Sequence, residues 1–113
     1  MSRPVGVIGV PTSAGAFAPG QEQAPRALRE AGLLESLREG GVVVEDRGDR
    51  DLWRWRPDRE NRRAQNMRAV VEIVRETAGR VAEVAGSGQA TLVLGGDCTV
   101  GVGTVAGLSL IHI

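Results

Sequence analysis

The chain has 113 residues, of which 42% are hydrophobic and 25% charged. This composition is typical of a folded protein, and the length allows one domain but not two modules with separate cores. Fourteen arginines balance fourteen acidic residues, and no overall field favours nucleic acid or an anionic membrane. We therefore expect neither partner. The apolar run at 5–10 is shorter than a secretory core of about 7 residues or more. The single cysteine, Cys98, cannot form an intrachain disulfide, so we expect a cytoplasmic protein.

The first forty residues predict a strand, a loop and a helix. Residues 4–10 form a short β-branched apolar run, which is typical of a strand buried on both faces. Small residues and proline at 11–20 predict an exposed loop. Pro25 suits the first turn of a helix, which Gly32 bends or divides. The predicted apolar face of this helix comprises Leu28, Leu34 and Leu37.

The middle of the chain predicts a second strand followed by a charged loop. Gly40 and Gly41 supply a left-handed stop to the preceding helix. Residues 42–44 then predict a second buried strand. From 45 to 63 the sequence is a charged loop that contains both tryptophans. Its mixture of basic and acidic residues favours a solvated loop or a subunit contact over nucleic-acid binding.

The last part of the chain predicts a long helix, a strand and a turn. Apolar residues recur at steps of three and four, which predicts a core-facing helix. This stripe comprises Met67, Val70, Val71, Val74, Thr77, Ala78, Val81 and Ala82. Gly86 and Gly88 end the helix, and residues 90–94 predict a third strand. Residues 95–99 turn from that strand into a segment that begins another helix.

This alternation predicts an α/β fold with a parallel sheet and helices on both faces, because parallel neighbours need long crossover connections. Ligands of such sheets bind in loops at the carboxyl ends of the strands. Three segments qualify by position: 11–20, 46–57 and 95–99.

The segment Leu94–Thr99 resembles the Gly-Gly-Asp-His-Ser segment of the arginase, agmatinase and formimidoylglutamase family. Two earlier regions, around 9–34 and at 46–49, resemble the same family in the same order. The residues that carry the resemblance are Gly9-Val10-Pro11, Gly20, Ala24-Pro25, Leu28-Arg29, Gly32-Leu33-Leu34, Asp46-Arg47-Gly48-Asp49, Leu94-Gly95-Gly96-Asp97-Cys98-Thr99, Gly101, Gly103, Thr104 and Gly107. The resemblance implies a three-layer α-β-α fold, of which residues 1–107 are the N-terminal part.

The resemblance also implies the chemistry. A full-length relative would use two manganese ions to activate a water, which attacks a guanidino or amidino carbon. The substrate would be a small guanidino compound, and we expect the full-length protein to be a homo-oligomer. The later Asp-x-His-x-Asp and Asp-x-Asp segments, which supply most of the family's metal ligands, are absent. We therefore expect this chain to be inactive alone.

Cys98 stands where the family has a histidine metal ligand. A thiolate suits zinc or iron better than manganese, so three alternatives stay open: a substitute ligand, a small residue lining an altered site, or an inert thiol. Asp97 is either a group that orients a metal ligand or the N-cap of the following helix, and we favour the N-cap. Gly95, Gly96 and Thr99 complete the predicted site loop.

Two functions are therefore considered: a metal-dependent hydrolase of the guanidino C–N bond, and a non-catalytic subunit with the same fold and an assembly or regulatory role. Residues 108–113 stand outside both, because their composition differs from the rest. They match one reading frame of the end sequence of a transposase-based sequencing library, so we interpret them as a non-native, adapter-derived tail; a genuine terminal strand is the alternative. His112 is accordingly excluded as a ligand.

Overall fold

The computed structural model describes residues 3–109, and within them the strands form one parallel sheet. Strand β1 (Val5–Val10) lies in the centre, with β2 (Val44–Asp49) on one side and β3 (Ala90–Gly95) on the other. Both pairs are parallel, so all three carboxyl ends meet at one edge of the sheet. The fold class predicted from the alternation is therefore confirmed.

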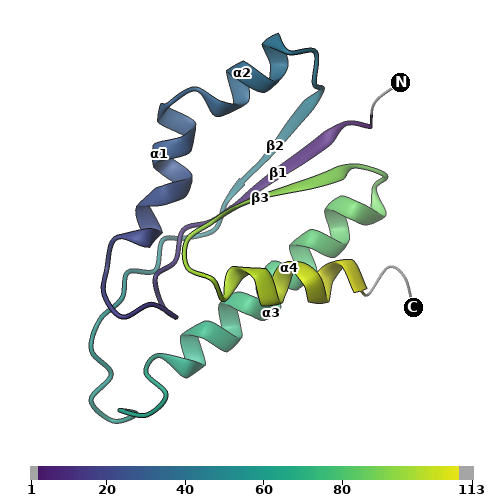
Figure 1. Cartoon of the computed structure of the whole chain (residues 1–113). Helices are drawn as coiled ribbons and strands as arrows, with labels where there is room; N and C mark the ends of the chain where they lie inside the picture. Colours follow the sequence, from purple (N-terminus) through teal and green to yellow (C-terminus); the bar gives the residue numbers. More distant parts are fainter. Residues whose placement is uncertain (1–2, 110–113) are drawn as a thin grey trace.

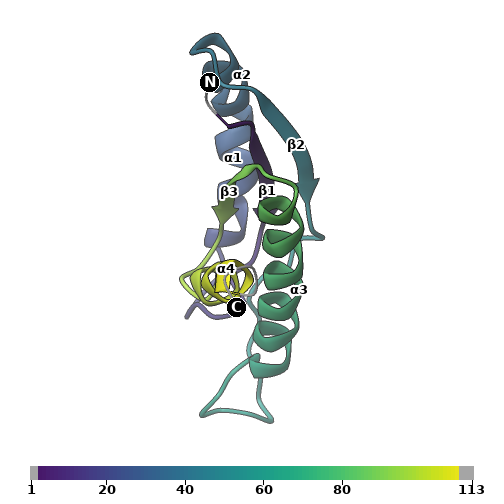
Figure 2. The same cartoon turned by 90° about the vertical axis from the view of Figure 1, so that its right-hand side faces the viewer.

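Helices cover the two faces of this sheet (Figures 1 and 2). A short 3-10 turn, η1 (Gln21–Gln23), leads into α1 (Ala24–Glu30) and α2 (Leu33–Glu39), which lie on one face. The long helix α3 (Met67–Gly86) lies on the other. The last helix, α4 (Val100–Ser109), runs beside α3.

The core divides between these faces because side chains alternate along a strand. Val7 packs with Leu34 and Leu94 on the α2 face. Its neighbour Ile8 packs with Val81 of α3 on the opposite face. The central strand is thus buried on both sides, as its continuous apolar run predicts.

Helix α4 packs closely on α3 through two glycines. A Cβ atom at Gly103 would lie 2.7 Å from the carbonyl oxygen of Val74, and one at Gly107 would lie 2.5 Å from that of Ala78. The absence of side chains there allows the two backbones to approach. The opposite face of α4 is apolar and exposed, with Val102 62% exposed.

The predicted second strand was wrong in both position and burial. Strand β2 begins at Val44 and continues to Asp49, through residues assigned from the sequence to a loop. Val43 is 64% exposed. Because β2 lies at the edge of the sheet and pairs only with β1, it tolerates charged side chains that a central strand would not.

The first helical segment is divided at Gly32, as predicted, where the backbone is left-handed with φ of +89°. The predicted common face of its leucines was wrong. Leu34 is buried whereas Leu28 is 41% exposed, because the left-handed residue changes the direction of the chain between α1 and α2.

Helix α3 confirms the long apolar periodicity, with a rotated buried face. Thr77 and Val81 are buried as predicted, but Met67 is 52% exposed. Ile73 and Val84 are buried in addition, since they lie on the side that faces β1 and β3.

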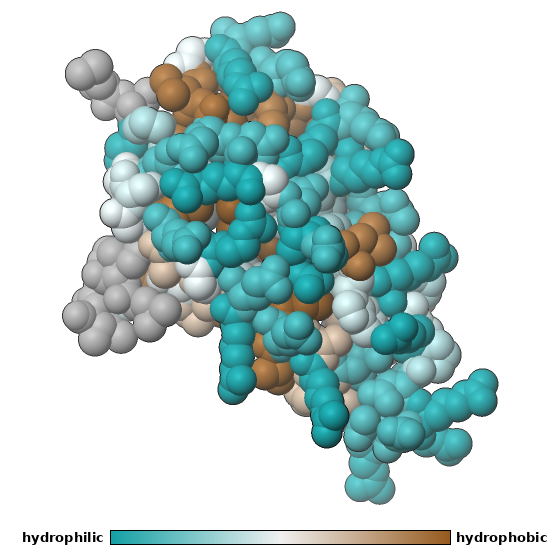
Figure 3. All heavy atoms as spheres, turned by 180° about the vertical axis from the view of Figure 1, so that it is seen from behind, coloured by the Kyte–Doolittle hydropathy of each residue, from teal (hydrophilic) through white to brown (hydrophobic). Residues whose placement is uncertain are grey.

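The side of the molecule opposite to the view of Figure 1 is mostly hydrophilic (Figure 3). None of the described helices combines the length and apolarity needed to cross a membrane. The predicted non-native tail at 108–113 falls in part outside the described residues, as does His112. Leu108 and Ser109 continue α4.

Candidate functional site

The loop after β1 and the turn after β3 are joined directly at the carboxyl edge of the sheet. The Asp97 backbone N–H donates to the carbonyl oxygen of Thr12 at 3.0 Å. Gly96 lies against the Thr12 backbone so closely that a Cβ atom would overlap it. A glycine is therefore required at this position for the two segments to meet.

The Asp97 carboxylate completes this junction. Asp97 is 5% exposed, and its Oδ1 accepts hydrogen bonds from the backbone N–H of Thr99 at 2.9 Å and from the Thr99 hydroxyl. Its Oδ2 accepts one from the backbone N–H of Gly15 at 2.8 Å. The bond to Thr99 is the kind that an N-terminal capping residue makes, and α4 begins at the next residue. Both carboxylate oxygens are therefore engaged.

Cys98 follows on the same turn and is exposed, with a free thiol. Among residues 3–109 there is no group of three or more His, Cys, Asp or Glu side chains that would hold a metal ion. The Cys98 thiol is therefore available as a metal ligand, whereas both oxygens of the neighbouring Asp97 carboxylate already accept hydrogen bonds. Residues 3–109 do not form a metal centre by themselves.

A second carboxylate, Glu22, organises the loop after β1. Its Oε1 accepts hydrogen bonds from the Ser13 hydroxyl and from the backbone N–H of Gly20, each at 2.7 Å. The Ser13 oxygen in turn accepts the backbone N–H of Trp55 at 2.7 Å. Glu22 and Ser13 are 1% and 0% exposed. This buried cluster connects the loop after β1 to the segment after β2.

The hydrogen bonds to the buried Glu22 carboxyl favour its charged form. Burial alone would raise its pKa, but the hydrogen bonds from Gly20 and Ser13 outweigh burial and hold the pKa below its ordinary value. Hydrogen bonds to the charged form have this effect. Glu22 and Ser13 were not predicted as functional residues, because neither stands in a motif and their contact depends on the folding of the loop between them.

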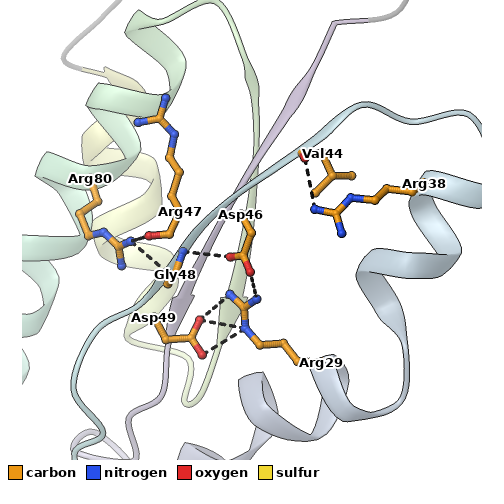
Figure 4. A network of polar contacts seen from close by, with 8 residues as sticks. All are labelled: Arg29, Arg38, Val44, Asp46, Arg47, Gly48, Asp49 and Arg80. Atoms are coloured by element: carbon orange, nitrogen blue, oxygen red, sulfur yellow. Dashed lines mark hydrogen bonds and ion pairs between the residues drawn. The ribbon is translucent and has the colours of Figure 1, made fainter.

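Asp46 and Asp49 lie within β2 and share one arginine, as Figure 4 shows. The Arg29 guanidinium, from α1, lies 2.6 Å from Asp46 Oδ2 and 2.7 Å from Asp49 Oδ1. Gly9 of β1 leaves the space that the Asp49 carboxylate fills, since a Cβ there would overlap it. The prediction that this motif lies in a loop at the ligand edge was wrong, because residues 46–49 are part of β2.

The ion pairs set the protonation of this cluster. Asp49 and Asp46 raise the pKa of the Arg29 guanidinium, and Arg29 lowers the pKa of Asp46. On the other face of the sheet, Arg80 of α3 donates to the carbonyl oxygens of Arg47 and Gly48 at 2.9 and 3.0 Å (Figure 4). These contacts hold the edge strand β2 against α1 and α3. The carboxylates of Asp46 and Asp49 are both paired with Arg29.

The structure thus brings parts of all three predicted segments, 11–20, 46–57 and 95–99, into one polar junction. The segment 11–20 meets the turn 95–99 through Asp97, and it meets the segment after β2 through backbone hydrogen bonds between Trp53 and residues Pro11 and Ser13. Gly95, Gly96 and Thr99 lie in this junction, whereas Cys98 faces outward.

These features define an α/β protein with a glycine-rich turn and a buried aspartate where the carboxyl ends of β1 and β3 meet. The sequence model of the arginase family matches residues 3–112. The chain belongs to the arginase family.

Individual relatives agree with this assignment. The chain is 40% identical to human arginase-1 (Homo sapiens) over 111 residues, covering 98% of this chain and 34% of that protein. It is 38% identical to the hepatic arginase of Aquarana catesbeiana, covering 97% of this chain and 34% of the relative. The chain therefore spans about a third of the length of the curated relatives it matches.

Solved structures give the same coverage. The crystal structure of arginase from Bacillus subtilis superposes with a TM-score of 0.81 at 31% identity, over 96% of this chain and 35% of that one. The arginase from Bacillus caldovelox gives a TM-score of 0.77 at 32% identity, over 97% and 38%. The predicted family resemblance and arginase-like fold are confirmed, and this structure contains part of that fold.

Proposed function

We propose that this sequence is the N-terminal part, residues 1–107, of one arginase-like α/β domain that hydrolyses a guanidino or amidino C–N bond. The observation that carries the proposal is the turn after β3. Asp97 fixes this turn to the loop after β1 through Gly15, and Cys98 stands exposed beside it. Ligands of open α/β sheets bind at this edge.

Cys98 is the residue that we assign to the metal. Asp97 has both oxygens engaged, so its role is to hold the turn and thereby orient Cys98. We propose that the other ligands lie beyond residue 107, since residues 3–109 contain no group of three or more His, Cys, Asp or Glu side chains that would hold a metal ion. When bound, paired metal ions would supply an activated water for hydrolysis. Family membership favours manganese, and the thiolate favours zinc or iron.

The proposal extends to the setting of the enzyme. The substrate is a small guanidino compound, and neither nucleic acid nor a membrane is a partner. The balanced charge supports this, since fourteen basic residues face fourteen acidic ones. We place the protein in the cytoplasm as a homo-oligomer.

One observation favours a second function. Cys98 replaces an imidazole with a thiol at the position where the family resemblance implies a histidine ligand. A relative that has lost this ligand would keep the fold and serve as a non-catalytic subunit in assembly or regulation.

Metal loading and urea release test these alternatives together. Protein extended beyond residue 107 by its own coding sequence is stripped of metal, reloaded separately with Mn²⁺, Zn²⁺ or Fe²⁺, and assayed for urea release from arginine and agmatine. We expect metal-dependent activity, and we expect Cys98→Ser to reduce the bound metal per chain.

Cys98→His is the matched variant, because it restores the residue that the resemblance implies. If it shifts the preferred metal towards Mn²⁺, the assignment of Cys98 as a ligand is supported. Unchanged metal content in both variants would overturn that assignment. Stoichiometric metal without hydrolysis of any guanidino compound would instead favour the non-catalytic subunit.

A further inference from the structure

A small cavity lies between the loop after β1 and the loop that joins β2 to α3. Its volume is about 260 Å³, and its lining includes Phe17, Trp55, Arg62, Arg63 and Gln65. Gly15 forms part of the same wall. Small-molecule sites are concave and combine apolar walls with a few polar groups, and this cavity has that composition.

The lining of the cavity is basic, with two arginine side chains. None of its lining residues is acidic. Within residues 3–109, Arg62 and Arg63 form no salt bridge, in contrast to Arg29, Arg47 and Arg50. In a chain of zero net charge, two unpaired guanidinium groups at one cavity provide a local site for an anion, which arginine binds through directed hydrogen bonds.

Two aromatic rings accompany this charge. Phe17 is 99% exposed. Burial of a phenyl group stabilises a protein, and Phe17 makes no such contribution here. Trp55 is half-buried, and the bond from its backbone N–H to Ser13 holds its main chain. Aromatic side chains pack favourably against flat apolar groups, so the rings add an apolar contact to the anion site.

The cavity also has a fixed support. The Gly15 backbone N–H is bound to Asp97 Oδ2 at 2.8 Å, and Glu22 and Ser13 hold the base of the same loop. The loop that supplies Arg62 and Arg63 projects from the body of the protein as a hydrophilic extension, at the lower right of Figure 3. One wall is therefore anchored to the sheet and the other carries the charges.

We propose that this cavity binds a small molecule that combines one anionic group, a carboxylate or a phosphate, with a flat apolar body. The anion pairs with Arg62 and Arg63, and the body lies against Phe17 and Trp55. The inference stands on these residues and does not depend on hydrolysis at the turn after β3.

Titration of ¹⁵N-labelled protein with benzoate and with phenyl phosphate tests the proposal. We expect saturable shifts of the Trp55 indole N–H signal with one or both ligands, larger than those of Trp53. Benzamide, which has the ring without the charge, is expected to bind at least tenfold more weakly. The tighter of the two anions identifies the anionic group.

Matched variants distinguish binding in the cavity from general electrostatic attraction of an anion to the protein. Arg62→Gln with Arg63→Gln is expected to weaken binding at least tenfold. Arg54→Gln with Arg75→Gln removes the same charge outside the cavity and is expected to change affinity less than twofold. Phe17→Ala, at a side chain without packing partners, is expected to weaken binding about threefold while leaving thermal unfolding unchanged.

The proposal is overturned by either of two results. The first is the absence of saturable Trp55 shifts with both anions. The second is an equal loss of affinity in the two double-arginine variants, which would indicate attraction to the charged loop as a whole.

Discussion

The carboxyl ends of β1 and β3 and the edge strand β2 are held in place by different kinds of contact. The first region is joined by close backbone approach at Gly96 and by the buried carboxylates of Asp97 and Glu22. The second is fastened by the partly exposed guanidinium of Arg29. Buried contacts of fixed geometry cost more to disturb than exposed ion pairs, so the two regions differ in their tolerance of substitution.

The largest effect is expected at Gly96. Gly96→Ala places a methyl group on the Thr12 backbone, and backbone cannot move aside as a flexible side chain can. We expect a loss of about 3 kcal/mol in the free energy of unfolding, measured by urea denaturation. Gly101→Ala is the control, because its Cβ meets open space on a helix; it is expected to stabilise by up to about 1 kcal/mol.

Glu22→Gln tests the buried cluster. The substitution removes the charge that accepts hydrogen bonds from Ser13 and Gly20, and we expect a loss of about 2 kcal/mol. Glu39→Gln, at an exposed position, is expected to stay within about 0.5 kcal/mol. Equal effects of the two substitutions in thermal unfolding would contradict a structural role for Glu22.

Arg29→Gln breaks both ion pairs that join α1 to β2 and is expected to cost about 1 kcal/mol, since the pairs are only partly buried. Arg26→Gln removes a pair whose side chains are 76% and 66% exposed and is expected to have almost no effect. A loss at Arg29 as large as that at Gly96 would remove the contrast between the two regions.

The smallest expected effect is the pH dependence contributed by Asp46. The hydrogen bond from Arg29 holds the pKa of the Asp46 carboxyl below its ordinary value in the folded protein. As pH falls, Asp46 is therefore protonated in the unfolded state at a higher pH than in the folded state. The contribution of the pair to stability is therefore present above about pH 4 and decreases at lower pH. Urea midpoints between about pH 5 and 3 should fall less steeply in Asp46→Asn than in the wild type; equal slopes would exclude this contribution.

The sequence by itself determined the alternation of strands and helices, the division at Gly32 and the family. These features depend on local periodicity, on backbone preferences of single residues and on motifs that are continuous in the chain. The turn Leu94–Thr99 was recognisable for the same reason, because its glycines and its aspartate are neighbours in sequence.

Only the tertiary structure decided which residues meet. The extent of β2 depends on pairing with β1 rather than on its own composition, and for that reason its charged residues were assigned to a loop. The contacts of Glu22 with Ser13, of Asp97 with Gly15 and of Arg29 with Asp46 and Asp49 join segments between 9 and 82 residues apart. No local sequence pattern encodes contacts between residues so far apart in the chain. They form when parallel strands bring their carboxyl ends to one edge of the sheet.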